Sequence, residues 1–184
     1  MTERLATQLA ENIDLAERVL TLLPELHKVA DRLVEVYEAG GRLFTFGNSG
    51  SAADAQHLAG EMIGRYQRTR RPLPAVALTC IADDFGYDDV FACQVDGFVQ
   101  PGDMVVAFST SGRSPNVVRG LDAARRRGAT TVYFGGGSGG GPAATHADHA
   151  LVVESTRTAR IQEMHLLLLH LLSERVDAWA AGEA

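Results

Sequence analysis

Cysteine is scarce in this sequence, and its scarcity excludes two kinds of scaffold. Of the 184 residues only 2 are cysteine, Cys80 and Cys93, and they do not form a CxxC pair. A disulfide framework needs more cysteines, and a thiolate zinc site needs closely spaced ones. We therefore expect neither, and we interpret both cysteines as small apolar residues of a protein in a reducing cytoplasm.

An excess of basic residues and a long apolar run are also missing. The formal net charge is −6, so we expect no basic surface for nucleic acid. The most apolar stretch, MHLLLLHLL at 164–172, is too short to span a bilayer. The acidic, amphipathic N-terminus has none of the features of a signal peptide. We expect no nucleic-acid partner, no membrane role and a cytoplasmic location.

The pattern of apolar residues predicts an α/β fold. Residues 2–39 have apolar positions at helical spacing, interrupted at Pro24, and predict two helices in a hairpin. From residue 42 onward, strand-like segments (42–47, 74–79, 103–109, 130–135, 149–154) alternate with helical ones (51–66, 114–127, 158–180). Such alternation predicts a doubly wound parallel sheet with helices on both faces. We expect one domain over 1–184, with N-terminal helices at 1–40 and an α/β core at 41–184 that includes the C-terminal helix.

Two loops rich in hydroxyl groups follow predicted strands. Gly47-Asn48-Ser49-Gly50-Ser51 follows the first strand, and Ser109-Thr110-Ser111-Gly112-Arg113-Ser114 follows the third. Ligands of such sheets bind at the carboxyl ends of the strands, where hydroxyl groups and a helix N-terminus favour a phosphate. The lysine of a P-loop is missing, so a sugar phosphate fits better than a nucleotide. The alternative is that these side chains only cap helices.

A third loop, GGGSGGG at 135–141, consists almost entirely of glycine. It contains the GxGxxG pattern of dinucleotide sites at Gly135, Gly137 and Gly140, and Glu154 stands at about the distance of a ribose-binding acid. The residues before the next strand are too few for the helix that would receive a pyrophosphate. We therefore favour a flexible loop over a dinucleotide site.

Polar residues on two predicted helices could provide chemistry. His57 and Glu61 are four residues apart and share one helix face. Such pairs are often solvated surface contacts, but this helix begins at the first hydroxyl loop, which favours a metal or acid–base role. The last helix is apolar nearly all round, which indicates burial between subunits. By itself, His170 on that helix is interpreted as a buried core or interface histidine.

Four segments together carry a resemblance to a known family. They are GNSGSAADAQHLAGEMIGRY at 47–66, DDFGYDDVF at 83–91, FSTSGRSPNVV at 108–118, and ARIQEMH at 159–165 followed by His170. With them, from its first predicted helix to its last, the chain resembles the sugar isomerase (SIS) domain proteins, and within these the phosphoheptose isomerases. The resemblance implies a five-stranded parallel sheet between helices. It also implies a homotetramer with one Zn²⁺ per subunit in a site near the subunit interfaces.

The resemblance further implies an activity and a set of site residues. The activity is the aldose–ketose isomerisation of D-sedoheptulose 7-phosphate to D-glycero-D-manno-heptose 7-phosphate, with Glu61 and His170 as the catalytic acid–base pair. The implied metal ligands are His57, Glu61, Gln162 and His170. The implied substrate contacts are Asn48, Ser49, Gly50, Ser51, Glu61, Arg65, Asp83, Asp84, Ser109, Thr110, Ser111, Ser114 and Gln162.

The sequence departs from the family pattern near the substrate. Ser49 stands where isomerases commonly have glycine, Asp83 replaces an asparagine, and the link before it is shortened. An added negative charge opposes an anionic substrate. Gln162 and His170 are also about 12 Å apart along one helix, so we expect an irregular helix or ligands from symmetry-related helices.

A non-catalytic SIS protein is the alternative to an isomerase. It would bind a phosphosugar, or act as a scaffold that associates with the initiator DnaA. The initiator-associating protein shares ARIQEMH but lacks the glutamate and the second histidine, which this sequence has as Glu61 and His170. Their presence favours the enzyme.

Overall fold

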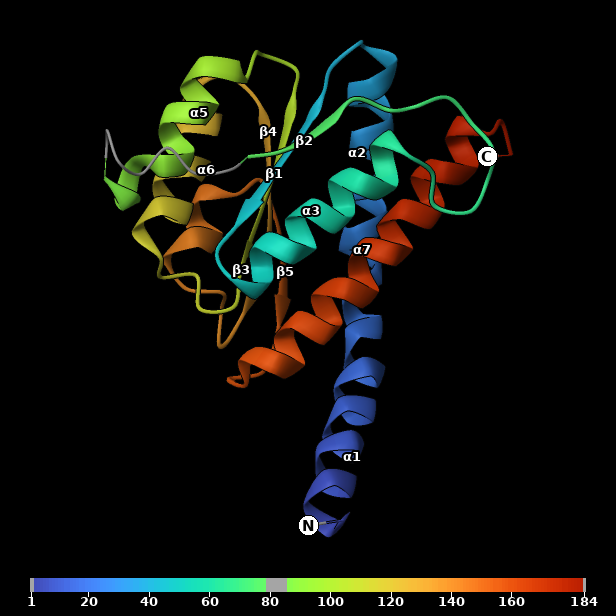
Figure 1. Cartoon of the computed structure of the whole chain (residues 1–184), viewed down its shortest axis with the longest axis vertical. Helices are drawn as coiled ribbons and strands as arrows, with labels where there is room; N and C mark the ends of the chain where they lie inside the picture. Colours follow the sequence, from blue (N-terminus) through green and yellow to red (C-terminus); the bar gives the residue numbers. More distant parts are fainter. Residues whose placement is uncertain (1, 79–85, 184) are drawn as a thin grey trace.

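A five-stranded parallel sheet forms the centre of the computed structural model, which describes residues 2–78 and 86–183 (Figure 1). The strands are β1 (Leu43–Gly47), β2 (Ala75–Ala77), β3 (Met104–Ser109), β4 (Thr130–Gly136) and β5 (His149–Val153). They lie in the order β2-β1-β3-β4-β5, and all neighbouring strands are parallel. This confirms the predicted sheet, and the strand order places a topological switch point between β1 and β3.

Helices cover both faces of the sheet, as the alternation of segments predicted. Side chains of β3 alternate between two cores: Met104, Val106 and Phe108 face one, and Val105 and Ala107 face the other. The first core also contains residues of α2 (Leu23–Glu38), α3 (Gly50–Ile63) and α7 (Thr158–Ala180), and the second contains residues of α5 (Val90–Phe98) and α6 (Pro115–Arg126). Every residue of β3 is buried, which explains its unbroken apolar sequence.

The two N-terminal helices do not form the predicted hairpin. Helix α1 (Thr2–Val19) continues through the short 3₁₀ turn η1 (Leu20–Leu22) into α2, and the helices run end to end, so that α1 projects beyond the sheet (Figure 1). Pro24 lies in the first turn of α2, where its missing N–H costs no helical hydrogen bond. The prediction was wrong because a proline marks the start of a helix without setting its direction.

The C-terminal helix α7 has 23 residues and the predicted bounds. Leu168, Leu169 and Leu172 are buried in the core, whereas Leu166, Leu167 and Leu171 are 36–39% exposed. Its apolar surface is therefore only partly covered by the same chain. Neither α7 nor any other described helix combines the length and apolar character needed to cross a membrane.

The segment between β2 and β3 contains a helix that the sequence pattern did not reveal. The short 3₁₀ helix η2 (Tyr87–Asp89) leads into α5, which packs against α6. The buried residues of α5 include Val90, Phe91 and Val95. This helix lies beside the end of β1 and so forms one wall of the switch-point region.

The glycine run, expected to be a flexible loop, is packed only in part: Gly140 is buried, whereas Ser138 and Gly139 are exposed. After β4 the chain turns through glycines with positive φ, namely Gly137, Gly139, Gly140 and Gly141, and then forms only η3 (Pro142–His146), a 3₁₀ helix of 5 residues. The Ala143 N–H donates to Gly112 O over 3.0 Å, so the run packs against the second hydroxyl loop. It leads into no α-helix that could receive a dinucleotide.

Candidate active site

The two hydroxyl-rich loops lie side by side at the switch point. In the β1–β3 pair Gly47 stands opposite Phe108, so residues 48–51 and 109–114 leave adjacent strand ends. The side-chain amides of Asn48 and Asn116 join the loops, each donating to the other's oxygen over 2.9 Å. Tyr87 Oη donates to Asn48 Oδ1 over 2.8 Å. These contacts connect both loops to η2 at the crevice where ligands bind in such sheets.

The hydroxyl groups that precede α3 and α6 do not cap these helices. Ser49 stands before α3 and Ser114 before α6, and neither side chain makes a capping hydrogen bond. Ser109 Oγ instead accepts the Gly112 N–H over 3.1 Å, and Ser111 Oγ accepts the Arg113 N–H over 3.3 Å. The capping explanation therefore fits neither Ser49 nor Ser114. Both helices begin at these loops, where the positive ends of their dipoles favour an anion.

A cavity of about 210 Å³ opens between β1, α3 and α5. Its lining includes Asn48, Ser49, Gln56 and Tyr87. Ser49 has φ 51° and ψ −120°, a conformation in which a side chain is strained. Ser49, which replaces the glycine usual in the family, therefore has a backbone conformation that suits glycine.

His57, Glu61 and His170 converge although α3 and α7 are far apart in the sequence. Their ligand atoms all lie within 4.8 Å of one another. His57 Nε2 is 3.0 Å from Glu61 Oε1 and 3.2 Å from His170 Nε2. The Tyr66 ring lies 5.6 Å from the His170 ring, between centroids. Packing of α3 against α7 therefore assembles two imidazoles and a carboxylate.

This donor set fits a zinc ion. Imidazole nitrogen and carboxylate oxygen are usual zinc ligands, and two Zn–N bonds of about 2.05 Å at a tetrahedral angle would separate the nitrogens by about 3.3 Å. The observed separation of His57 Nε2 and His170 Nε2 is 3.2 Å. Burial lowers the pKa of His170, the charge of His57 lowers it further, and Glu61 opposes both. The neutral imidazole that results is the form that binds metals.

Gln162, the fourth implied ligand, lies elsewhere within this chain. Its side chain lies against Gly50, so closely that a Cβ there would overlap the Gln162 amide. Gly50 begins α3, whereas His57 lies about two turns further along it. Coordination by Gln162 stays a prediction, and it needs a second chain or a rearrangement.

The remaining implied substrate residues occupy different positions. Ser51 is buried in the first turn of α3, whereas Ser111 in the second loop is exposed and Thr110 half-buried. Arg65, just beyond α3, donates to Thr69 Oγ1 over 3.2 Å. Asp83 and Asp84 lie outside the described residues.

Several residues next to the site were missed by sequence reasoning. Asn116 is 1% exposed and lies in the first turn of α6, so its place two residues after Ser114 was the available signal. Asp54 lies one turn before His57 on α3; burial raises its pKa to about 6, which His57 partly opposes, and its Oδ2 has no hydrogen-bond partner. Its spacing of three residues from His57 was the signal for a shared face.

The buried histidine of α7 is His165, whereas His170 is only half-buried. His165 is 0% exposed, and its Nε2 lies 3.0 Å from Gly135 O. Within this chain His170 is therefore not a buried core histidine, and its burial at a subunit interface stays a prediction.

Comparisons with known proteins agree with the fold. The family model described as SIS domain matches residues 7–136. A phosphoheptose isomerase of Bordetella avium is 41% identical, over 100% of this chain and 98% of its own. One from Roseiflexus is 44% identical, over 92% of this chain and 90% of its own. The structure of a phosphoheptose isomerase from Neisseria gonorrhoeae has a TM-score of 0.88 and 37% identity, covering 96% of this chain and 98% of that one. The chain therefore belongs to the SIS domain family, among the relatives named phosphoheptose isomerase.

Proposed function

We propose that this protein is a phosphoheptose isomerase that interconverts D-sedoheptulose 7-phosphate and D-glycero-D-manno-heptose 7-phosphate. One observation carries the proposal: His57, Glu61 and His170 converge within 4.8 Å, in a chain that matches relatives of that name over its whole length. Aldose–ketose isomerisation moves a proton between C1 and C2 through an enediol, which needs a base at carbon and an acid at oxygen. The converging carboxylate and imidazole are suited to these two tasks.

The arrangement assigns a role to each part of the site. Glu61 Oε1 faces His57, which leaves Oε2 to take the proton from carbon. His170 Nε2 also faces His57, which leaves its Nδ1–H to serve the oxygen. The hydroxyl loops and the N-termini of α3 and α6 hold the phosphate, and this binding orients the reactive end of the sugar. Zn²⁺, held by His57, Glu61 and His170 with Gln162 as a fourth predicted ligand, would polarise the carbonyl and hydroxyl oxygens.

A homotetramer is part of the proposal. Leu5, Leu9 and Ile13 of α1 are 55–62% exposed, and at spacings of four they form one apolar face. Exposed apolar stripes of this kind favour association, and α1 projects from the body of the subunit (Figure 1). A second subunit would also offer a route for Gln162 to reach a metal. Mass measurement in solution tests the assembly, and an active, metal-loaded monomer would contradict it. The expected cytoplasmic location stays a prediction.

The test of function is conversion of sedoheptulose 7-phosphate by the wild type and by Glu61→Gln and His170→Ala. The zinc content of each preparation is measured together with its fold. We expect both variants to stay folded and to lose turnover. His149→Ala is the matched control, because His149 begins β5, at the end of the sheet away from the site, and should remain active.

A zinc-loaded wild type without turnover would contradict the proposal. Retained binding of the sugar phosphate by that protein would then favour a non-catalytic phosphosugar-binding protein. Binding to the initiator DnaA would favour the scaffold.

A further inference from the structure

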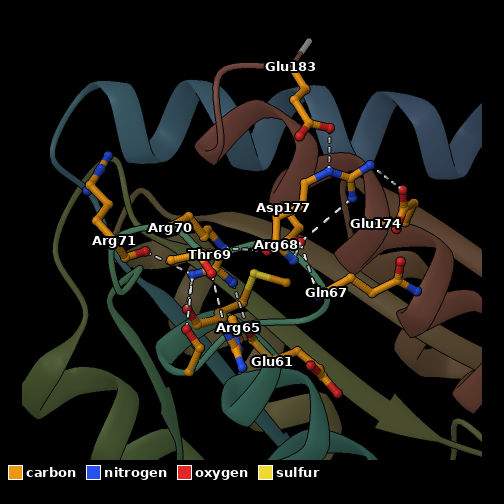
Figure 2. Close-up of polar contacts among 12 residues, drawn as sticks. Glu61, Arg65, Gln67, Arg68, Thr69, Arg70, Arg71, Glu174, Asp177 and Glu183 are labelled. Atoms are coloured by element: carbon orange, nitrogen blue, oxygen red, sulfur yellow. Dashed lines mark hydrogen bonds and ion pairs between the residues drawn. The ribbon is translucent and has the colours of Figure 1, made fainter.

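The C-terminal end of α3 is capped by an arginine from the following loop. The last carbonyls of a helix have no partner within it, and Glu61 lies in this last turn. Arg70 Nη2 donates to Glu61 O over 2.7 Å, and Arg70 Nη1 donates to Met62 O over 2.9 Å. The Arg70 side chain is 0% exposed. One buried guanidinium thus binds the backbone of the proposed catalytic glutamate itself (Figure 2).

The same loop is bound to α7 through a buried carboxylate. Asp177 is also 0% exposed, and its Oδ1 accepts Arg70 Nε over 2.6 Å. Its Oδ2 accepts the backbone N–H groups of Gln67 and Arg68 over 3.1 and 2.7 Å. Asp177 therefore holds both the loop and the guanidinium that caps α3 (Figure 2).

The position of Asp177 on α7 relates this network to the site. Asp177 follows His170 by seven residues on the same helix, and at about 100° per residue the two side chains lie within roughly 20° of the same direction. That direction faces α3, since His170 reaches His57 and Asp177 reaches Arg70. The pair joins the helix that carries His57 and Glu61 to the helix that carries His170.

We propose that Arg70 and Asp177 are positioning residues for the isomerase reaction, which hold the Glu61 carboxylate and His57 against His170 by fixing the end of α3 to α7. This inference rests on the proposed function for the reaction it serves. A buried ion pair is weak evidence for stability, since apolar replacements are often neutral. Catalytic and metal-binding groups, in contrast, need placement to within about 0.5 Å. A fork of donors from arginine meets that need better than the point charge of lysine.

The chain offers a matched control in a second buried carboxylate. Asp103 is 3% exposed and accepts the N–H groups of Arg42 and Gln100, each over 2.8 Å, and Arg42 Nη2 over 2.9 Å. It lies just before β3, at the end of the sheet opposite the site. Asp103→Asn therefore removes a similar network without touching α3 or α7.

The experiment compares Asp177→Asn, Arg70→Lys and Asp103→Asn in the full chain. Zn²⁺ affinity is measured by competition with a chelator. Steady-state kinetics with sedoheptulose 7-phosphate give kcat and KM, and thermal unfolding gives stability. We expect Asp177→Asn and Arg70→Lys to lower Zn²⁺ affinity or kcat by about 10- to 100-fold, as loss of groups that orient metal ligands does. KM should change by less than about 3-fold, because the phosphate loops are untouched. Asp103→Asn should lose stability while keeping kcat and Zn²⁺ affinity.

Two results would overturn the inference. One is that Arg70→Lys, or a folded Asp177→Asn, has the same kcat and the same Zn²⁺ affinity as the wild type. The other is that Asp103→Asn loses as much kcat as Asp177→Asn and Arg70→Lys do when its loss of stability is the same. The Arg70–Asp177 network would then have only a general structural role. If Asp177→Asn does not fold, the charge-conserving Arg70→Lys decides. Failure of the proposed function looks different, since the wild type itself would then show no turnover.

Discussion

Asn48 and Asn116 bind each other through both of their side-chain amide groups, with each amide donating to the other's oxygen over 2.9 Å. Asn48 Oδ1 also accepts from Tyr87, so both of its acceptor positions are occupied. One N–H of the Asn48 amide is left for a ligand. The predicted contact between Asn48 and the substrate therefore uses this one N–H, and the buried Asn116 sets its direction.

Replacement of this partner should weaken substrate binding. Asn116→Leu keeps the approximate shape but removes the amide that orients Asn48 and accepts the Val117 N–H. We expect KM to rise about 10-fold, kcat to change less, and stability to fall by about 1–3 kcal/mol, the cost of unpaired buried groups. Steady-state kinetics and urea unfolding measure these effects, and an unchanged KM in a folded variant would contradict the role of the pair.

A substitution at Ser114 distinguishes a phosphate-binding role of this serine from a helix-capping role. Removing a capping serine usually costs about 1 kcal/mol, but the Ser114 side chain makes no capping bond to α6. Ser114→Ala should therefore change the unfolding free energy by less than about 0.5 kcal/mol and still raise KM for the sugar phosphate. A loss of stability with unchanged KM would restore the capping explanation.

The backbone at Ser49 predicts a stabilising substitution. With φ at 51° and ψ at −120°, serine is strained by about 1–3 kcal/mol, and the greater freedom of unfolded glycine offsets about 0.4–1 kcal/mol of the relief. Ser49→Gly should raise stability by about 1 kcal/mol in thermal or urea unfolding. Ser49→Ala is the control, because it loses the hydroxyl but keeps the Cβ. If alanine stabilises as much as glycine, strain is not the cause.

His165 should make stability depend on pH. Burial lowers its pKa from 6.5 to about 4, against the opposing effect of its bond to Gly135 O. Between these pH values the unfolded chain binds a proton that the folded chain does not, so stability falls as pH falls. The slope from this group approaches about 1.4 kcal/mol per pH unit.

Urea unfolding at pH 7.5, 6.5 and 5.5, with chelator present to remove metal effects, measures this slope. His165→Gln has no such proton to bind, so its stability should fall less over the same range. Parallel curves for the two proteins would show that His165 does not titrate as its burial requires.

Local patterns predicted the sheet well because each strand carries its own signal. The β3 stretch MVVAFS is buried on both faces, so its unbroken apolar run needed no tertiary information. Helix α5 gave no comparable signal. Its buried residues Val90, Phe91 and Val95 pack on α6, but Asp96 and Gly97 interrupt the pattern over only 9 residues.

The site was predictable where its residues share a helix or a loop. His57 and Glu61 are neighbours on α3, and the hydroxyl groups are concentrated in two short segments. The meeting of His57 with His170 spans 113 positions and that of Arg70 with Asp177 spans 107. Such contacts follow from how α3 crosses α7, which no local pattern contains; the family resemblance pointed to the first pair, and nothing pointed to the second.

The packing of the glycine loop against the second hydroxyl loop limits how this protein can evolve or be engineered. A Cβ at Gly112 would overlap the Gly140 carbonyl, and one at Gly141 would lie 2.7 Å from Ser111 O. The second hydroxyl loop, which is proposed to bind the substrate, thus leaves room only for glycine at positions of the neighbouring glycine run. Mutational tolerance should therefore be low at Gly140 and Gly141, and a library that varies these two positions would chiefly yield binding-defective proteins.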